Sequence, residues 1–501
     1  MALDADAVVI GGGPAGSAVA RLLAQWNRSV VLIARTPGKR PIAESLPPSC
    51  ARLLDQLELR QVVDRAGFLR AAGNTVRWAN GEARTEWFPN RQFGLQVPRD
   101  RFDALLLAGA QAAGAHVIRD ATVRSVTHDG EHSTVAYEPA SDAGAHRRCR
   151  ARWVLDCSGR AGLVARAGWR QPEVAERTIA VVAIFESDRW RGAEYAAHTL
   201  VESHAAGWAW SVPVSETRRY VTVMLDPRHT ALPSRRSLLR AYRNELAETK
   251  LIADLVHDAQ LVEEPWGCDA SPYGAASAGD AAARTLLVGD AATFIDPLSS
   301  FGVKKALASA WLAAIVVNSV LDEPALSQPA IALFDRRERD MYRELRRAAS
   351  SLARDAASAH AGDFWTTRLE PEHAEPESAL DAAVARRDPR VLDAFDELKR
   401  RDAVRLRAAG TLRVVQRAVV RGNRVLLEEH LAAPLLGDAA RYCRNVDLVT
   451  LTRLAPRFEQ VPDLFAAYNR AASPAPLPDF LGALSALIGY EMLEFENSRI
   501  P

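Results

Sequence analysis

The first turn of the chain restricts its fold more than any other feature. The apolar run Val8-Val9-Ile10 leads into Gly11-x-Gly13-x-x-Gly16, a helix of small residues follows, and a second apolar run covers residues 30–33. In a β-α-β unit these glycines have separate tasks: Gly11 permits a tight turn, Gly13 lets a pyrophosphate approach the backbone, and Gly16 lets helix and strand pack closely. The spacing predicts a dinucleotide site, with a purely structural glycine-rich turn as the alternative.

One part of this fingerprint is absent. An acidic residue usually ends the second strand and holds the adenosine ribose, but here the strand ends Ile33-Ala34-Arg35. Arg35 could indicate a 2′-phosphate, and hence NADP. Because motifs later in the chain favour FAD, we interpret Arg35 as a neighbour of a cofactor phosphate or of the adenine, and the ribose contact stays unassigned.

Composition and charge narrow the class of protein. The chain has 501 residues, enough for two or three domains, and its 63 basic and 62 acidic side chains leave a net charge of +1, which gives no support for nucleic-acid binding. The five cysteines are scattered and odd in number, so we expect a reduced, cytoplasmic protein without a metal site. The most apolar predicted helix, residues 306–321, is too short to span a bilayer, so we expect a buried core helix and no membrane span.

The order of strands and helices divides the chain into predicted parts. We predict an α/β protein with a Rossmann-like domain, whose first part covers residues 1–175 and whose second part, with long helices, covers 281–365. Alternating strands within 176–280 predict an antiparallel sheet, the substrate domain, inserted between the two parts. Residues 366–380 are rich in Glu, Pro and Ala and predict a linker. Residues 380–501 predict a mostly helical C-terminal α+β region with one β-hairpin.

Three motifs stand in a characteristic order: Gly11-x-Gly13-x-x-Gly16, Arg99-x-x-Phe102-Asp103, and Gly289-Asp290-Ala291-Ala292 followed by Asp296-Pro297. Together they resemble the FAD-dependent monooxygenase superfamily, which includes aromatic hydroxylases and flavin-dependent halogenases and binds FAD on a glutathione-reductase-type domain. The resemblance implies that Gly289 and Asp290 contact the ribityl and pyrophosphate region of FAD, and that Arg99 lies beside the cofactor. The full set of cofactor-binding residues that it implies is Gly11, Gly13, Ala15, Gly16, Arg35, Ser45, Arg99, Gly289, Asp290, Pro297, Ser300, Gly302 and Val303.

Three further segments resemble the halogenases more narrowly. Glu44-Ser45-Leu46 is similar to their Gly-Glu-Ser segment, with Ala43 in place of glycine. Residues 208–213, Trp-Ala-Trp-Ser-Val-Pro, are similar to their WxWxIP signature, and residues 294–303 are similar to the segment beside the flavin. Because residues i and i+2 share one face of a strand, a pair of core aromatics is the alternative interpretation of the two tryptophans. The candidate catalytic residues are Glu44, Trp208, Trp210 and Arg70.

One departure separates the chain from the halogenases. They place an essential lysine shortly after the Glu-Ser segment, between flavin and substrate, whereas this chain has no lysine between Lys39 and Lys250. The corresponding stretch, residues 67–74, offers only Arg70, and a guanidinium stays charged and is a poor nucleophile. One of the pair Lys304-Lys305 could face the flavin; the alternative is a solvated pair at the start of a helix.

These observations predict an FAD-dependent monooxygenase that hydroxylates an electron-rich aromatic substrate through a flavin C4a-hydroperoxide. Glu44 is the candidate charged group near the site, with a helix-start carboxylate as the alternative, and Arg70 and Arg77 could orient an anionic substrate. A flavin-dependent halogenase, a reductase or dehydrogenase of the geranylgeranyl-reductase type, and a non-enzymatic flavin-binding module are the other readings that we keep open.

Partners follow from the same resemblance. Similar flavoproteins act on tryptophan residues of a partner polypeptide, on carrier-bound metabolites or on free aromatic compounds. We therefore expect an indole or phenol that is free or is borne by a peptide, protein or carrier. Since there is one convincing GxGxxG motif, we expect NAD(P)H to bind transiently or to act through a separate flavin reductase. The C-terminal region is expected to cover the substrate cleft or to dock such a partner.

Overall fold

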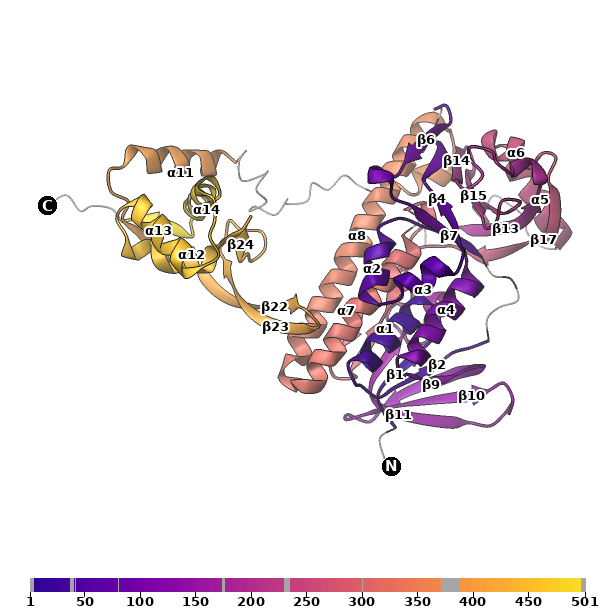
Figure 1. The fold of residues 1–501 in the computed structure, drawn as a ribbon, viewed down its shortest axis with the longest axis horizontal. Helices are drawn as coiled ribbons and strands as arrows, with labels where there is room; N and C mark the ends of the chain where they lie inside the picture. The colour runs from indigo at the N-terminus through magenta and orange to yellow at the C-terminus, as the bar shows by residue number, and fades with distance from the viewer. Residues whose placement is uncertain are drawn as a thin grey trace. The chain divides into compact units, whose positions relative to one another are not determined.

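The computed structural model describes residues 4–36, 40, 42–79, 81–173, 176–228, 235–299, 301–370 and 388–496. The chain forms two compact units, Met1–Glu370 and Pro371–Pro501. Figure 1 draws the second unit at the orange-to-yellow end of the colour range. The N-terminal motif, the tryptophan pair and the Gly-Asp turn all belong to the first unit.

A mainly parallel sheet forms the centre of the first unit. Its strands follow the order β19-β20-β11-β1-β2-β8, and β10 and β9 extend it from β11 in antiparallel fashion. β1 pairs in parallel with β2 and with β11, and both β1 and β2 are almost entirely buried, as expected for parallel strands with covered faces. The strands are β1 (Ala5–Ile10), β2 (Val30–Ile33), β8 (His116–Ile118), β9 (Ala121–His128), β10 (Ser133–Pro139), β11 (Arg147–Asp156), β19 (Gly279–Asp280) and β20 (Thr285–Leu287).

Helices pack beside this sheet and position the turns of the site. α1 packs against both α4 and α7, and α7 packs against the long helix α8 (Figure 1). The helices of the first unit are α1 (Pro14–Gln25), α2 (Cys50–Gln56), α3 (Arg60–Arg65), α4 (Arg99–Ala112), α5 (Arg235–Ala247), α6 (Leu251–Val256), α7 (Gly302–Asp322), α8 (Ser327–Ala359) and α9 (Asp363–Thr366). Its short 3-10 helices are η1 (Pro89–Arg91), η2 (Gly159–Ala161), η3 (Asp188–Trp190), η4 (Gly289–Ala291), η5 (Pro297–Ser299) and η6 (Pro324–Leu326).

Helix α7 is longer than the sequence predicts. It contains 21 residues and is long and apolar enough to cross a membrane by length and composition. The expectation that this helix is too short to span a bilayer is therefore wrong. The feature that marks α7 as a core helix is its burial, since 83% of its most apolar stretch is buried inside the fold.

A second sheet in the first unit carries the tryptophan pair. Its seven strands follow the order β17-β13-β16-β15-β14-β5-β6, and all neighbours are antiparallel except the parallel pair β14 and β5. Residues 73–87 therefore complete a sheet that the sequence predicts within 176–280 alone; their pairing is long-range and leaves no local signal. The strands are β5 (Gly73–Arg77), β6 (Arg84–Trp87), β13 (Ile179–Glu186), β14 (Thr199–His204), β15 (Gly207–Pro213), β16 (Arg218–Leu225) and β17 (Gln260–Asp269).

The first unit also contains two small sheets. In the order β3-β7-β4, strand β3 brings the Glu-Ser segment beside the start of α4. β12 pairs with β18 in the other small sheet. The strands are β3 (Ala43–Leu46), β4 (Leu69–Ala71), β7 (Gly94–Pro98), β12 (Arg170–Pro172) and β18 (Tyr273–Ala275).

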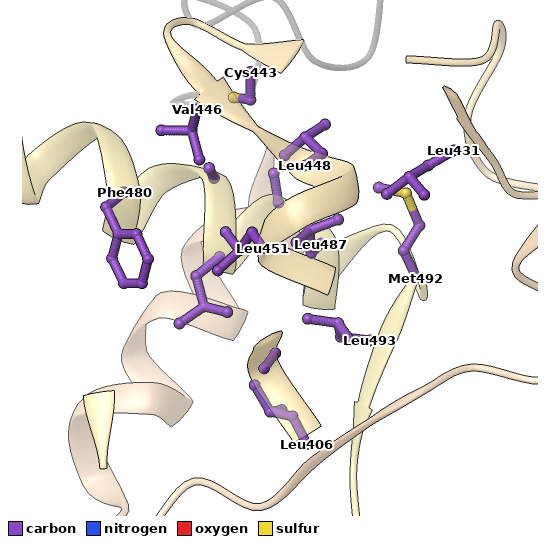
Figure 2. Packing of buried hydrophobic residues seen from close by; sticks show 14 of the residues in the cluster. Leu406, Leu431, Cys443, Val446, Leu448, Leu451, Phe480, Leu487, Met492 and Leu493 are labelled. Atoms are coloured by element: carbon purple, nitrogen blue, oxygen red, sulfur yellow. The ribbon is translucent and has the colours of Figure 1, made fainter. Parts of the chain in front are cut away.

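The second unit has its own apolar core, in which Leu448, Leu451 and Leu487 are fully buried (Figure 2). The predicted hairpin is present as β22 and β23, and the described part of the predicted helix near 378–404 is α11. The elements are α11 (Pro389–Arg400), β21 (Leu406–Ala408), β22 (Arg413–Arg421), β23 (Arg424–Ala432), β24 (Tyr442–Cys443), β25 (Val446–Asp447), α12 (Leu448–Leu454), η7 (Ala455–Arg457), α13 (Val461–Ala471), α14 (Leu477–Gly489) and β26 (Leu493–Phe495).

The predicted linker 366–380 divides into two parts. Residues 366–370 belong to the first unit, where the Glu370 N–H donates to Ser350 Oγ on α8 at 2.7 Å. Residues 371–387 lie outside the described part of the chain. The start of the linker is therefore fixed to the first unit by α8.

Candidate active site

The turn between β1 and α1 has room only for glycine at two positions. Gly11 has a φ of +109°, and a Cβ there would lie 2.4 Å from the Cys157 carbonyl oxygen. A Cβ on Gly16 would lie 1.8 Å from the Gly11 carbonyl oxygen. At Gly13, the N-cap of α1, the nearest atom to an added Cβ would be Asp103 Oδ2 at 3.9 Å, and no side chain caps the helix. The first N–H groups of α1 are therefore accessible to an anion such as a phosphate.

A second turn, η4, packs against the start of α1. Gly289 has a φ of +65°, and a Cβ there would lie 3.4 Å from Ala15 Cβ. The Gly289 N–H donates to Ser309 Oγ at 2.9 Å, and the Tyr273 hydroxyl donates to the Asp290 carbonyl oxygen at 2.6 Å. These contacts hold the backbone of the turn, while the Asp290 side chain stays 31% exposed and lines a pocket.

The pocket between the two turns contains about 820 Å³ of space, part of it open to solvent. The uncapped helix start suits a pyrophosphate, and the Asp290 carboxylate suits sugar or ribityl hydroxyls, so the residues present fit a flavin dinucleotide. The predicted cofactor residues that line this pocket are Ala15, Arg99, Asp290, Pro297, Gly302 and Val303. Gly11, Gly13, Gly16 and Gly289 shape the turns around it.

Three predicted cofactor residues have other positions. Arg35 is exposed at the end of β2 and is not among the described residues that line the pocket. Ser45 lies in β3 and lines a smaller pocket next to the first. Ser300 lies outside the described residues. A cofactor contact for each of the three stays a prediction.

Arg99 binds two carboxylates at the wall of the pocket. Its Nη1 lies 3.0 Å from Glu44 Oε1, and its Nε and Nη2 donate to the two carboxylate oxygens of Asp103 at 3.0 and 3.1 Å. Burial lowers the pKa of Arg99, but Asp103 and Glu44 outweigh burial and leave that pKa raised. The guanidinium therefore stays charged and fixes both carboxylates.

Glu44 is half-buried in the extended strand β3, so its interpretation as a helix-start carboxylate is wrong. Burial raises the pKa of Glu44, and the charge of Arg99 lowers it in part. A carboxylate with a raised pKa is a stronger base than an ordinary carboxylate, which is a property that suits a general base.

The tryptophan pair lines the smaller pocket. Trp208 is buried and Trp210 is half-buried on β15, and their ring centroids lie 4.6 Å apart with an interplanar angle of 47°. β3, β14 and η5 complete this pocket, which contains about 360 Å³ of space, part of it open to solvent. Glu44 and Pro297 line both pockets. Trp208 also packs in a buried cluster with Trp365. It therefore serves the core and lines the pocket at the same time.

Asp296 directly precedes Pro297, which lines both pockets. Asp296 is 5% exposed and lines the larger pocket. Burial raises the pKa of Asp296 to about 6, while the charge of Arg368 and the Leu298 N–H, which donates to Asp296 Oδ1 at 3.3 Å, lower it. The Arg368 Nε lies 4.0 Å from Asp296 Oδ2. The sequence places Asp296 in a recognised motif, but no local signal connects it with Arg368, which follows α9.

The predicted catalytic residue Arg70 does not join Glu44 and the tryptophans. It is exposed on β4 and lines a separate pocket with Arg60 and Asp64. Arg77 also has a structural partner, because its Nη1 lies 2.9 Å from Oε1 of the fully buried Glu202. The structure therefore brings together three of the four predicted catalytic residues.

The two adjacent lysines have different environments. Lys305 is 4% exposed, so the interpretation of a solvated pair is wrong for this residue. Its Nζ donates to the Thr293 carbonyl and to Thr293 Oγ1, and lies 3.2 Å from Asp290 Oδ1. Lys304 is half-buried, with its Nζ 4.5 Å from the centroid of the Phe301 ring.

Comparisons with known proteins agree with this geometry. The sequence pattern of the family described as FAD binding domain matches residues 4–329, more than half of the chain. A tryptophan 2-halogenase of Chondromyces crocatus is 32% identical over 325 residues, which cover 63% of this chain and 61% of that protein. The chain thus spans less than two thirds of the length of this relative.

Two solved structures share the fold over nearly the whole chain. The flavin-dependent halogenase CmlS has a TM-score of 0.76 at 22% identity, covering 100% of this chain and 97% of that chain. The peptidyl tryptophan dihydroxylase QhpG has a TM-score of 0.67 at 21% identity, covering 92% of this chain and 95% of that chain. At these identities the likeness establishes the fold.

Proposed function

We propose that the chain hydroxylates an electron-rich aromatic substrate. The chain belongs to the FAD binding domain family and is a halogenase-like FAD-dependent oxidoreductase. The start of α1, Arg99 and Asp290 would hold FAD in the larger pocket. When bound and reduced, FAD supplies the activation of O2 for transfer of one oxygen atom to an aromatic ring. The remaining tasks belong to the side chains of the smaller pocket.

The smaller pocket suits a flat, uncharged ring. Trp208, Trp210, Val212 and Leu298 supply aromatic and aliphatic surface, and this surface excludes water from a bound ring. Such a wall favours an indole or a phenol over a highly charged substrate. We propose that the two tryptophans orient the ring toward the border with the larger pocket.

Glu44 is the proposed proton acceptor. It lines both pockets, and Arg99 fixes its carboxylate through the 3.0 Å contact. When an oxygen atom adds to the ring of a phenol or indole, a proton must leave the substrate, and a fixed carboxylate at the border can accept it. The raised pKa of Glu44 places this acceptor closer to neutral pH than an ordinary carboxylate.

The observation that carries hydroxylation is the environment of the lysines. Halogenases resemble this chain but need a lysine between flavin and substrate, and no lysine is among the described residues that line the smaller pocket. Lys305 lines the larger pocket, but its Nζ is engaged by Thr293, Gly289 and Asp290. An ammonium with these partners is not free to react. Halogenation is the second candidate, because the tryptophan 2-halogenase is 32% identical to this chain, whereas the dihydroxylase QhpG is 21% identical.

We further propose that the ring is borne by a peptide or a carrier and that a separate flavin reductase supplies electrons. The first point is supported by the fold shared with QhpG, which acts on peptidyl tryptophan and matches over 92% of this chain, the second unit included. The second is supported by the presence of one GxGxxG motif. The scattered positions and odd number of the cysteines support a cytoplasmic location.

Product mass in the presence and absence of halide tests this function. The full-length protein would be mixed with FAD, a flavin reductase, NADH, O2 and either tryptophan or a short tryptophan peptide, with and without bromide. We expect one added oxygen atom at a rate that bromide does not change. A brominated product would establish the second candidate, and a reduced product formed without O2 would establish a reductase.

A matched pair of variants tests the role of Glu44. We expect Glu44→Gln to lower turnover by about 10²-fold, the usual size of a general-base effect, while the bound FAD is retained. Asp64→Asn, a carboxylate in the Arg70 pocket, serves as the control and should leave turnover unchanged. Equal turnover in both variants would remove Glu44 from the mechanism.

A further inference from the structure

A buried polar network lies directly behind the turn that carries Gly289 and Asp290. Lys305, near the start of α7, reaches the turn with its Nζ, which lies 3.4 Å from the Gly289 carbonyl oxygen and 3.1 Å from Thr293 Oγ1. The same Nζ donates to the Thr293 carbonyl oxygen and lies 3.2 Å from Asp290 Oδ1. One buried ammonium therefore joins both ends of the turn to its only acidic side chain.

The same network continues away from the pocket to α8. Ser309, one turn after Lys305 on α7, accepts the Gly289 N–H at 2.9 Å. Glu338 on α8 is 3% exposed and faces both Ser309 and Lys305, whose hydroxyl and charge lower its pKa. Burial has the larger, opposite effect and raises the pKa of Glu338 to about 7, with Asp335 and Asp290 as the other charged groups that raise it.

The positions of these charges relative to the pocket differ. Lys305 lines the larger pocket, and Asp290, Glu44 and Asp296 line it as well. Lys305 lies next to Asp290, and its charge, together with that of Arg99, offsets the charge of the carboxylate at the place where an anionic cofactor must bind. Glu338 is not among the described residues that line the pocket, and Lys305 and Ser309 are its polar neighbours.

We propose that Lys305 and Glu338 are positioning residues for the FAD-binding turn, and that their opposite charges tune the stability of the reduced, negatively charged cofactor in opposite directions. Lys305 favours the reduced cofactor because a positive charge attracts the charge that reduction adds. Glu338 opposes this stabilisation of the reduced cofactor, because its negative charge lies near Lys305 and offsets the positive charge. The inference rests on FAD binding by the family and is independent of the substrate and of hydroxylation.

Four variants test the proposal, with two readouts: the Kd for FAD from fluorescence titration and the midpoint potential of the bound flavin. The measurements would be made near pH 8.5, where Glu338 is ionised. We expect Lys305→Met to weaken FAD binding by about tenfold or more and to shift the midpoint potential to a more negative value. We expect Glu338→Gln to shift the midpoint potential to a more positive value, by a smaller amount, with a Kd within about threefold of the wild type.

Matched controls exist on the same helices. Lys304→Met removes the neighbouring lysine, which does not line the pocket, and Glu344→Gln removes an exposed carboxylate of α8. Neither control should move the midpoint potential. A structural role alone would weaken FAD binding in the Lys305 and Glu338 variants without opposite shifts of potential.

Shifts of equal sign in Lys305→Met and Glu338→Gln, or shifts no larger than those of the controls, would overturn the proposal. If Lys305→Met does not fold, Lys305→Arg keeps the charge and should keep the potential within the range of the controls, and Glu338→Gln still tests the sign. Neither readout involves a product, so a failure of hydroxylation and a failure of this proposal are distinguishable.

Discussion

The two halves of the candidate active site are built from different parts of the chain. The cofactor wall, formed by the turns at residues 11–16 and 289–293, is made largely of backbone. At Gly16 and Gly11 it leaves no space for a side chain, because an added Cβ would lie 1.8 Å and 2.4 Å from the nearest carbonyl oxygen. The substrate wall, formed by β3, β14, β15 and η5, is made of side chains, chiefly Trp208, Trp210 and Glu44. A backbone wall recognises a cofactor through general features such as a phosphate. A side-chain wall can change its specificity one residue at a time.

This contrast explains how one fold can serve several reactions. The cofactor wall depends on φ values and close approaches that only glycine permits. The substrate wall depends on side chains whose replacement alters the shape and charge of the smaller pocket without affecting the turns. Relatives with the same cofactor wall can therefore differ in the chemistry that they perform.

The largest expected effect is on the cofactor wall. Gly16→Ala places a Cβ 1.8 Å from the Gly11 carbonyl oxygen, so either the helix or the turn must move. We expect loss of bound FAD and about 3 kcal/mol of lost unfolding free energy, measured by flavin absorbance and urea denaturation. Gly482→Ala is the control, because an added Cβ in that helix has nothing within 4 Å. Retention of FAD in Gly16→Ala would show that the wall is more adaptable than its backbone suggests.

An intermediate effect is expected at Asp296, which lines the larger pocket and directly precedes Pro297. Its pKa of about 6 lies above the ordinary value of 3.8, because burial disfavours the charged form. The folded protein therefore loses stability as the pH rises from about 4 through about 6. Between pH 4 and pH 8 we expect the wild type to lose roughly 2 kcal/mol of unfolding free energy relative to Asp296→Asn.

Urea denaturation of both proteins at the two pH values measures this difference directly. Asp188→Asn changes an exposed carboxylate and serves as the control. Removing Asp296 also leaves Arg368 without its nearest carboxylate, but that cost applies at both pH values and cancels in the comparison. A difference of opposite sign would show that the attraction to Arg368 outweighs burial.

The smallest expected effect is at Arg70, outside both walls. Arg70→Ala removes an exposed guanidinium that lines a separate pocket. We expect turnover within about twofold of the wild type and a change in unfolding free energy within about 0.5 kcal/mol. A large loss of turnover on a peptide substrate, with unchanged FAD binding, would instead assign Arg70 to substrate capture and extend the substrate wall.

The cofactor wall could be predicted from the sequence because its signals are local. The spacing of Gly11, Gly13 and Gly16, and the pair Gly289-Asp290 after a buried strand, determine the backbone within a few residues. The resemblance to halogenases also predicts that Glu44 and the two tryptophans belong to one site, and all three line the smaller pocket. Nothing in the residues themselves indicates that β3 lies opposite β15.

Contacts between distant segments could not be predicted. Lys305 looks like half of a solvated pair, and its burial depends on the turn at residues 289–293 and on α8. Arg368 follows α9 and meets Asp296 only in the folded unit. Arg70 was predicted as catalytic from its place in the sequence, and a short strand carries it to another face.

The seven-stranded sheet has a consequence for the exchange of parts between related enzymes. Asn74 to Arg77 pair with Thr199 to Glu202. Two strands from the N-terminal part of the chain therefore complete one edge of the sheet that carries the tryptophans. A fragment cut at 176–280 would leave the edge of β14 bare and prone to unwanted pairing. A chimaera that transplants the substrate half from a relative must therefore carry residues 73–87 with it. The sheet that carries the tryptophans is therefore encoded by two separate stretches of the gene, and an exchange between relatives must include both.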